Sequence, residues 1–363
     1  MGYQLPRSKF TKTTTMKDWI QIVNRLEQLL SENTELALAT VVHVDGSAYR
    51  RPGARMLVTG DGNWWGAISG GCLEGDMLKK AQMAMMTQQI KLVTYDTRED
   101  DPFQLGVGLG CQGLIDIIID PIRSHLEAFC LAMKQAISSY EPGVLCSNWD
   151  EKDLTSFQFM YVPQSDIHSY DADKKEILVQ KTAHYRLLEG KSSLLEYIPP
   201  MPRIWIMGNQ FDAMALIQQV NLLAWEIHWV GNVQKMNPLG KKLVNQVYDW
   251  EMDYQILPDD AIVMMTHDFD RDVFLMKKLS SLEHFAFWGI LGPQKRMDKL
   301  QGHLKDEGID ISVLRKKISS PIGLDVGAEG PEEIAISIIS EIIAQKNKRD
   351  GQPLKFREKP IHV

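Results

Sequence analysis

The hydrophobic positions of the N-terminal half follow two different periods. Apolar side chains recur every three or four positions in some stretches, which predicts amphipathic helices, and they alternate or cluster with β-branched residues in others, which predicts strands. The predicted helices are 16–32, the stretch from Leu73 to Met85, and 122–140. The predicted strands are 36–45, a hairpin over 55–69 around a Gly-Asp-Gly-Asn turn, 90–97, 114–120, 143–148, 157–162 and 176–182. This mixture predicts a unit of mixed α+β class.

A proline-rich break at 198–202 separates this half from a region in which strands and helices alternate. The predicted strands are 203–208, 226–231, 261–267 and 285–291, and the clearest helices are 211–223 and 331–345. Strands that alternate with helices imply a parallel sheet covered by helices, so the fold class is α/β with a C-terminal Rossmann-like domain. We therefore divide the chain into 1–198, 199–345 and a basic tail, 346–363.

Length and composition narrow the class of protein. The chain has 363 residues, 44% apolar and 24% charged, which suits a globular protein of two domains. A formal net charge of −7 argues against general nucleic-acid binding. No apolar run reaches the roughly 18 residues of a membrane span, and the basic start lacks the apolar core of a secretory signal. Four cysteines are typical of a reduced, cytoplasmic protein.

Candidate chemistry is densest between residues 46 and 113. Arg50, Arg51 and Arg55 lie within one short glycine-containing segment. A guanidinium presents a planar fork of donors that matches phosphate or carboxylate, so these residues are candidates for binding an anion. The structural alternative is that they pair with carboxylates of the protein itself.

Two glycine–cysteine motifs follow the arginine segment. The first opens a predicted helix, where free backbone N–H groups favour an anion and the helix field favours a thiolate. The second lies in a flexible loop. The alternatives are plain turns and small apolar cysteines, and the spacing suits neither a zinc site nor a CxxC motif. The candidate residues are Gly70, Gly71, Cys72, Gly108, Gly110 and Cys111. Cys130 and Cys146 fit core positions.

The second domain carries an altered nucleotide fingerprint after its first strand. Gly208 is present, but Gln210 occupies the position at which a glycine lets the backbone approach a pyrophosphate. The acidic residue that would bind a ribose is missing, because the second strand ends at Gly231-Asn232. Two interpretations stay open: a Rossmann-like domain whose nucleotide site has decayed, or a retained nucleotide or anion site.

His267 follows another predicted strand of this domain, within Thr266-His267-Asp268. Open α/β sheets place their ligands at the carboxyl ends of strands, so His267 is a candidate binding residue. The structural alternative is that Asp268 caps the next helix. Asp116 and Asp120 fall on one face of the 114–120 strand, and no acid–base partner is evident for either.

Several stretches resemble the xanthine dehydrogenase accessory factors, the XdhC/CoxI family. They span most of the chain in the family's order, and two of them contain the glycine–cysteine motifs, GAISGGCLEGDM and GVGLGCQGLIDIIIDP. The stretches are 38–62, 66–77, 106–121, 263–272, 289–296 and 321–343. The chain departs from the family's Gly-x-Gly-His fingerprint, since it has Gly208-Asn-Gln-Phe.

The resemblance implies a maturation chaperone, usually dimeric, that does not itself catalyse hydroxylation. Such proteins bind the molybdenum cofactor, shelter it while a cysteine desulfurase supplies sulfur, and hand it to a xanthine dehydrogenase-type apoenzyme. The three arginines and the first glycine pair would then meet the cofactor's phosphate, with Cys72 and Cys111 near the metal. Two alternatives come from other classes: an NAD(P)-dependent oxidoreductase that uses the second domain, and an interaction protein without a ligand.

Overall fold

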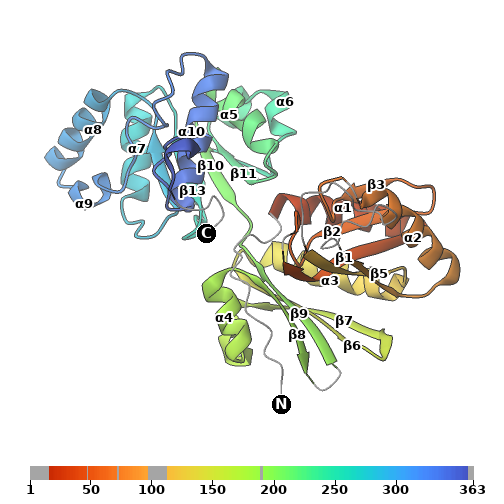
Figure 1. Ribbon diagram of the computed structural model, residues 1–363. Helices are drawn as coiled ribbons and strands as arrows, with labels where there is room; N and C mark the ends of the chain where they lie inside the picture. The colour runs from red at the N-terminus through yellow and green to blue at the C-terminus, as the bar shows by residue number, and fades with distance from the viewer. Residues whose placement is uncertain (1–15, 47, 72, 97–112, 189–190, 359–363) are drawn as a thin grey trace. The chain divides into compact units, whose positions relative to one another are not determined.

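The computed structural model describes residues 16–46, 48–71, 73–96, 113–188 and 191–358. The chain forms two compact units, which meet in sequence between Met201 and Pro202, and the second extends to Glu358 (Figure 1). The first unit is a mixed α+β structure and the second is a parallel α/β structure, as predicted.

The first unit contains an antiparallel sheet with β1 at its centre. The strand order is β3-β2-β1-β5-β4, with β1 at Leu36–Gly46, β2 at Arg55–Thr59, β3 at Trp64–Gly66, β4 at Lys91–Asp96 and β5 at Gly113–Asp120. Alternate residues of β1, including Ala37, Ala39 and Val41, pack toward α2 (Glu74–Thr87). The opposite face receives α1 (Met16–Ser31) and α3 (Arg123–Ser139). The predicted hairpin is confirmed as β2 and β3.

A second antiparallel sheet of this unit has the order β7-β6-β9-β8. Its strands are β6 (Gly143–Asp150), β7 (Asp153–Pro163), β8 (Ala183–Leu188) and β9 (Lys191–Ile198), and a short helix, η1 (Gln164–Ser169), follows β7. The predicted strand at 176–182 is wrong, because helix α4 (Ala172–Gln180) covers most of it. Asp171 caps this helix by accepting from the Lys174 N–H at 2.9 Å. Its apolar run is short and buries only Ile177, which is why the periodicity resembled a strand.

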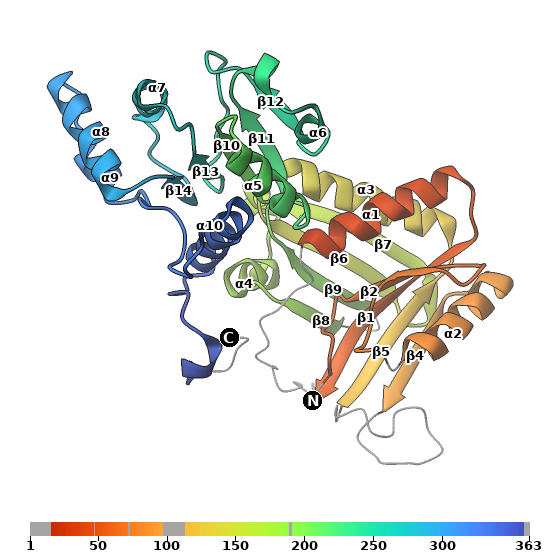
Figure 2. The ribbon, with the colours of Figure 1, turned by 90° about the horizontal axis from the view of Figure 1, so that it is seen from above.

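The second unit is built on a parallel sheet of order β12-β11-β10-β13-β14. The strands are β10 (Arg203–Met207), β11 (Glu226–Val230), β12 (Gln246–Tyr248), β13 (Ala261–Met264) and β14 (Phe287–Ile290). Helices α5 (Phe211–Asn221) and α10 (Pro331–Lys346) cover one face, and α7 (Phe269–Leu279), α8 (Gln294–Asp306) and α9 (Ser312–Arg315) cover the other (Figure 2). The short elements are η2 (Val233–Lys235), α6 (Pro238–Lys241) and η3 (Leu354–Phe356). The predicted Rossmann-like domain is confirmed.

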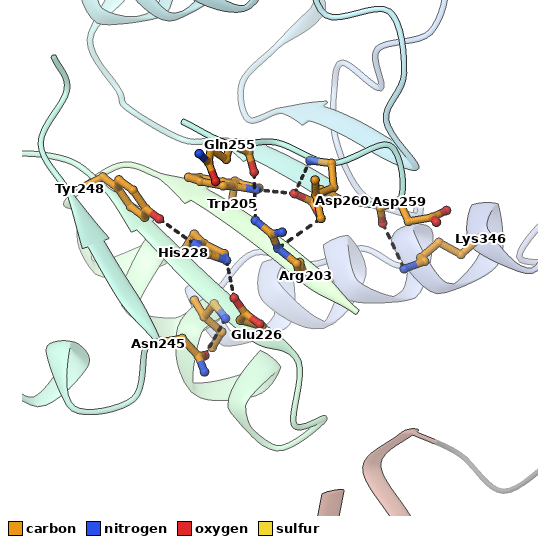
Figure 3. A network of polar contacts seen from close by, with 12 residues as sticks. Arg203, Trp205, Glu226, His228, Asn245, Tyr248, Gln255, Asp259, Asp260 and Lys346 are labelled. Atoms are coloured by element: carbon orange, nitrogen blue, oxygen red, sulfur yellow. Dashed lines mark hydrogen bonds and ion pairs between the residues drawn. The ribbon is translucent and has the colours of Figure 1, made fainter. Parts of the chain in front are cut away.

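A buried polar network ties together the amino ends of these strands (Figure 3). The Trp205 indole donates to Asp260 at 2.7 Å, and Arg203 donates to the Gln255 carbonyl at 3.0 Å. His228 stacks on Trp205 and bonds Glu226 at 2.8 Å. The network lies at the edge opposite to the one where α/β sheets bind ligands, so its role is to stabilise the fold.

Candidate functional site

The arginine segment between β1 and β2 is fastened by a buried ion pair. Arg55 is only 2% exposed, and its guanidinium donates to both carboxylate oxygens of Glu196, at 2.9 and 2.6 Å. A Cβ on Gly53 would lie 2.2 Å from the same carboxylate, so glycine is needed there. Arg55 therefore anchors the segment to β9. Its guanidinium pairs with Glu196, a carboxylate of the protein itself. This is the structural alternative given for the arginines above, and not the expected phosphate-binding role.

Arg50 and Arg51, by contrast, are half-buried at the same segment. The Nε atom of Arg50 is buried and has no hydrogen-bond partner among the described residues. Burial lowers the pKa of Arg51, but a guanidinium stays charged at neutral pH. A buried donor without an acceptor is costly, so this end of the sheet is suited to receive an anion.

The turn before α2 is organised by Ser69 and Glu74. The Ser69 hydroxyl accepts from the N–H groups of Gly71 at 3.2 Å and Leu73 at 3.1 Å, and it also bonds the Glu74 carboxylate. Burial raises the pKa of Glu74, but the hydrogen bonds from the Ser69 hydroxyl and N–H outweigh it and lower the pKa below its ordinary value. The Gly71 N–H, a sequence candidate for phosphate, is thus engaged by Ser69.

Tyr49 joins the arginine segment to this turn. A Cβ on Gly70 would lie 3.2 Å from atoms of the Tyr49 ring, so the two segments are in contact. Tyr49 is 71% exposed, and a Cβ on Gly71 would meet nothing within 4 Å. Arg50 and Arg51 follow Tyr49 directly in the chain, and we name the exposed surface around Tyr49, Gly70 and Gly71 the Tyr49 surface.

The strand that follows the second glycine–cysteine motif in the sequence begins at the same end of the sheet as the arginine segment. Gly113, the first residue of β5, pairs with Gly46, the last residue of β1 and the point from which the arginine segment leaves. The candidates Gly108, Gly110 and Cys111 lie outside the described residues, as does Cys72. Their expected place beside the arginines stays a prediction.

A histidine–aspartate pair on the other face of this sheet was missed by the sequence analysis. A bulge after Val41 turns His43 toward Asp116, whose Oδ2 lies 3.0 Å from His43 Nδ1, and Thr94 donates to the same carboxylate at 2.6 Å. Burial raises the pKa of Asp116, but these two bonds outweigh it and lower the pKa. Asp120 likewise bonds His125, at 2.9 Å. Both carboxylates thus have partners that only strand pairing and packing reveal.

In the second unit, the fingerprint turn after β10 is tightly tied to its neighbours. A Cβ on Gly208 would lie 2.3 Å from the Met265 carbonyl oxygen, so this position requires glycine. The Asn209 side chain accepts from the Asn232 N–H at 2.8 Å and donates to the Asn232 carbonyl at 3.1 Å. Gln210 begins α5 in an extended conformation, without a side-chain cap.

His267 faces the first turn of α5. Its Nε2 bonds the carboxylate of Asp212, a residue only 4% exposed, while the imidazole itself is half-exposed. His267 adopts a left-handed backbone with φ of 56°. The helix-cap alternative for Asp268 is confirmed, since its side chain accepts from the N–H groups of Asp270 and Arg271 at 3.0 and 3.2 Å. Gly208, Gln210 and His267 thus belong to a second candidate site.

The two remaining cysteines lie in the core. Cys130 and Cys146 are buried, as predicted, and burial raises the pKa of Cys146 to about 11, so it stays a thiol. Among the described residues, no cluster of three His, Cys, Asp or Glu side chains could hold a metal. None of the helices in the described part of the chain combines the length and apolarity needed to cross a membrane.

Two family models match the chain, one in each unit. The model of the XdhC and CoxI family matches residues 29–96, which include the arginine segment and the turn before α2. The model of the XdhC Rossmann domain matches residues 204–342, which include nearly the whole parallel sheet and its helices. Both candidate sites lie inside matched ranges.

Individual proteins resemble this chain over most of its length and most of their own. A Bacillus subtilis protein named as a probable subunit of xanthine dehydrogenase is 28% identical over 89% of this chain and 97% of its own length. The Escherichia coli molybdenum cofactor insertion chaperone PaoD is 22% identical over 84% of this chain and 81% of its own. A crystal structure described as a xanthine dehydrogenase from Bacillus halodurans matches 92% of this chain and 98% of its own, with a TM-score of 0.66 and 24% identity, which shows a shared fold.

Proposed function

Because this chain belongs to the XdhC and CoxI family, we propose that it is an accessory factor that binds the molybdenum cofactor and delivers it to a xanthine dehydrogenase-type apoenzyme. Two relatives support this role by name, one as a probable xanthine dehydrogenase subunit and one as a molybdenum cofactor insertion chaperone. The residues of the first unit supply the chemistry that such a cargo needs.

The observation that carries the proposal is the buried Nε of Arg50, which has no hydrogen-bond partner in the described part of the chain, next in sequence to the exposed ring of Tyr49. The cofactor combines an anionic phosphate with a flat pterin. In our proposal Arg50 and Arg51 bind the phosphate, since guanidinium groups form charge-assisted, bidentate bonds with it. The exposed ring of Tyr49 and the open backbone at Gly71 offer an approach for the flat ring system.

The finer parts of the proposal extend this carrier role. Cys72 and Cys111 lie near the metal and protect it or its sulfur ligand, because thiolates suit a soft metal centre. A cysteine desulfurase supplies that sulfur while the cofactor is bound. The carrier acts in the cytoplasm as a homodimer and is not itself an enzyme. Each of these proposals assumes that the protein binds the cofactor, and each can be tested by a separate experiment.

Cofactor retention tests the binding role directly. Purified full-length protein would be loaded anaerobically with molybdenum cofactor and desalted, and the retained pterin and molybdenum would be measured by fluorescence and mass spectrometry. We expect the variant Arg50→Ala/Arg51→Ala to retain roughly a hundredfold less, since each of the two lost charge-assisted bonds weakens binding by about tenfold. The matched control Arg123→Ala/Arg186→Ala removes two half-exposed arginines from elsewhere in the unit and should retain wild-type amounts.

Unchanged retention in the folded Arg50→Ala/Arg51→Ala variant would reject the Tyr49 surface as the binding site. A separate variant, Cys72→Ser/Cys111→Ser, tests the thiols, and we expect it to lose retention as well. If it retains the cofactor with its molybdenum, the thiol role is wrong while the phosphate role stands.

A further inference from the structure

The parallel sheet of the second unit has the strand order of a dinucleotide-binding fold. The strands follow one another outward from β10 to β12 on one side, and from β13 to β14 on the other, so the order of the chain switches sides between β10 and β13. Such folds bind a dinucleotide at the carboxyl ends of the strands beside this switch point. Binding needs three things there: a glycine turn open to the pyrophosphate, free N–H groups at the start of the first helix, and an acidic ribose ligand. The contacts of this chain test each requirement.

The glycine turn is closed by its own side chains. Asn209 makes two hydrogen bonds to the backbone of Asn232 and so links the carboxyl ends of the neighbouring strands β10 and β11. A Cβ on Gly231 would lie only 2.1 Å from the Asn209 side-chain oxygen, which shows how closely the two strand ends approach. Gln210 then presents an exposed side chain where the pyrophosphate requires bare backbone. This arrangement leaves little room for the phosphates.

The start of α5 already holds an anion, the carboxylate of Asp212. Asp212 accepts from the N–H of Ala213 at 2.8 Å, and His267 bonds its other oxygen. The side chain of Asp212 is only 5% exposed, so the positive end of the helix dipole already stabilises this carboxylate in the absence of a ligand. A phosphate at the same helix end would meet a buried like charge that His267 already bonds.

The ribose ligand is also absent. Asn232 follows β11, where a dinucleotide-binding domain has a carboxylate, and its side-chain oxygen accepts from the N–H groups of Gln234 and Lys235 at 3.1 and 3.3 Å. That oxygen caps η2 and is therefore engaged within the protein. None of the three requirements is met.

We infer that the second unit is closed to dinucleotides and that Asp212 serves there as an internal substitute for a phosphate, paired with His267. The inference concerns the second unit alone and does not depend on the carrier role. It argues against the oxidoreductase alternative, because the residues do not fit NAD(P). It also predicts that removing the Asp212 charge creates an anion site that the natural chain lacks.

Titration of the wild-type full chain is the first test. NADH and NADPH would be followed by nicotinamide fluorescence, and inorganic pyrophosphate by calorimetry. We expect no saturable binding of any of the three up to about 1 mM. Binding of one dinucleotide per chain with a Kd of about 10 µM or lower would overturn the inference.

The variant Asp212→Asn is the second test, because it removes the charge at nearly constant shape. We expect its affinity for pyrophosphate to rise roughly tenfold or more, because a like charge is removed and His267 is released. Asp270→Asn is the matched control: it removes an exposed carboxylate from the first turn of α7 and should gain nothing. If Asp212→Asn does not fold by circular dichroism, Asp212→Ala replaces it. A folded variant without a gain would show that Asp212 is not what excludes the anion.

Discussion

The two units each place a glycine turn before a helix, and the two turns differ in the residues that contact them. At α2 the carboxylate of Glu74 is bonded by Ser69, and the segment that touches the turn through Tyr49 carries Arg50, whose buried Nε has no hydrogen-bond partner among the described residues. At α5 the carboxylate of Asp212 is bonded by His267 and by the Ala213 N–H. A glycine turn and a helix start do not by themselves make an anion site, because a carboxylate of the protein can occupy the place of the anion. What distinguishes the first turn is the arginine segment that contacts it through Tyr49.

The largest expected effect comes from breaking the anchor of the arginine segment. Arg55→Ala should lower the free energy of unfolding by about 3–5 kcal/mol, because it leaves the Glu196 carboxylate buried and unpaired. Urea denaturation followed by tryptophan fluorescence would measure the change. The same variant should lose cofactor retention, because Arg50 and Arg51 lie on the segment that Arg55 fastens.

Two controls sharpen this prediction. Arg55→Met/Glu196→Leu replaces the pair by apolar side chains of similar size and should recover most of the stability. Lys134→Ala removes an exposed partner of Glu27 and should leave the urea midpoint nearly unchanged. If Arg55→Ala proved as stable as Lys134→Ala, the ion pair would not be the anchor.

Replacing the glycines of the two turns by alanine should lower the free energy of unfolding by unequal amounts. Gly208→Ala should cost about 3 kcal/mol, because its Cβ would overlap the Met265 carbonyl oxygen and would strain the packing of β10 against β13. Gly71→Ala should cost only about 1 kcal/mol, because its Cβ meets open space and only its positive φ of 115° is unfavourable. Thermal unfolding of both variants would rank them, and the reverse order would contradict the packing described for the second turn.

The smallest expected effect is the pH dependence of the Glu74 cap. The pKa of Glu74 in the folded protein lies below its ordinary value of 4.5, so its bonds to Ser69 stabilise the fold above that pH and are lost as the pH falls through the lowered pKa. Glu74→Gln should therefore be less stable than wild type by roughly 1 kcal/mol at pH 7. The difference should shrink as the pH approaches 3 in paired denaturation curves. A constant difference across this range would show that the charge of Glu74 is not involved.

Long periodic segments were predictable because their burial repeats locally. The apolar stripe of α1 placed Trp19, Ile22 and Leu26 on one face, and all three are buried. The apolar run of β10 and its alternation with helices placed it in a parallel sheet, and the local turn signals identified the β2–β3 hairpin. The segment at α4 failed because a helix that buries a single apolar side chain carries no clear period.

Partners distant in sequence could not be predicted. Arg55 looked like its neighbours Arg50 and Arg51, and only the approach of β9 gave it Glu196. Asp116 appeared to be a lone carboxylate on an apolar strand until the pairing of β1 with β5 placed His43 beside it. The loss of the fingerprint glycine at Gln210 was visible in the sequence, but the pairing of Asp212 with His267 was not.

The sequence by itself determined the fold class and the family, because these depend on periodicity and on motifs that lie within short stretches. The tertiary structure alone decided which charges the protein pairs internally. A charge is engaged or available according to the groups that long-range strand pairing and packing bring within hydrogen-bond distance, and that distance has no counterpart in residue spacing. For this reason Arg55 is an anchor, while the Nε of Arg50 finds no hydrogen-bond partner among the residues that the structure describes.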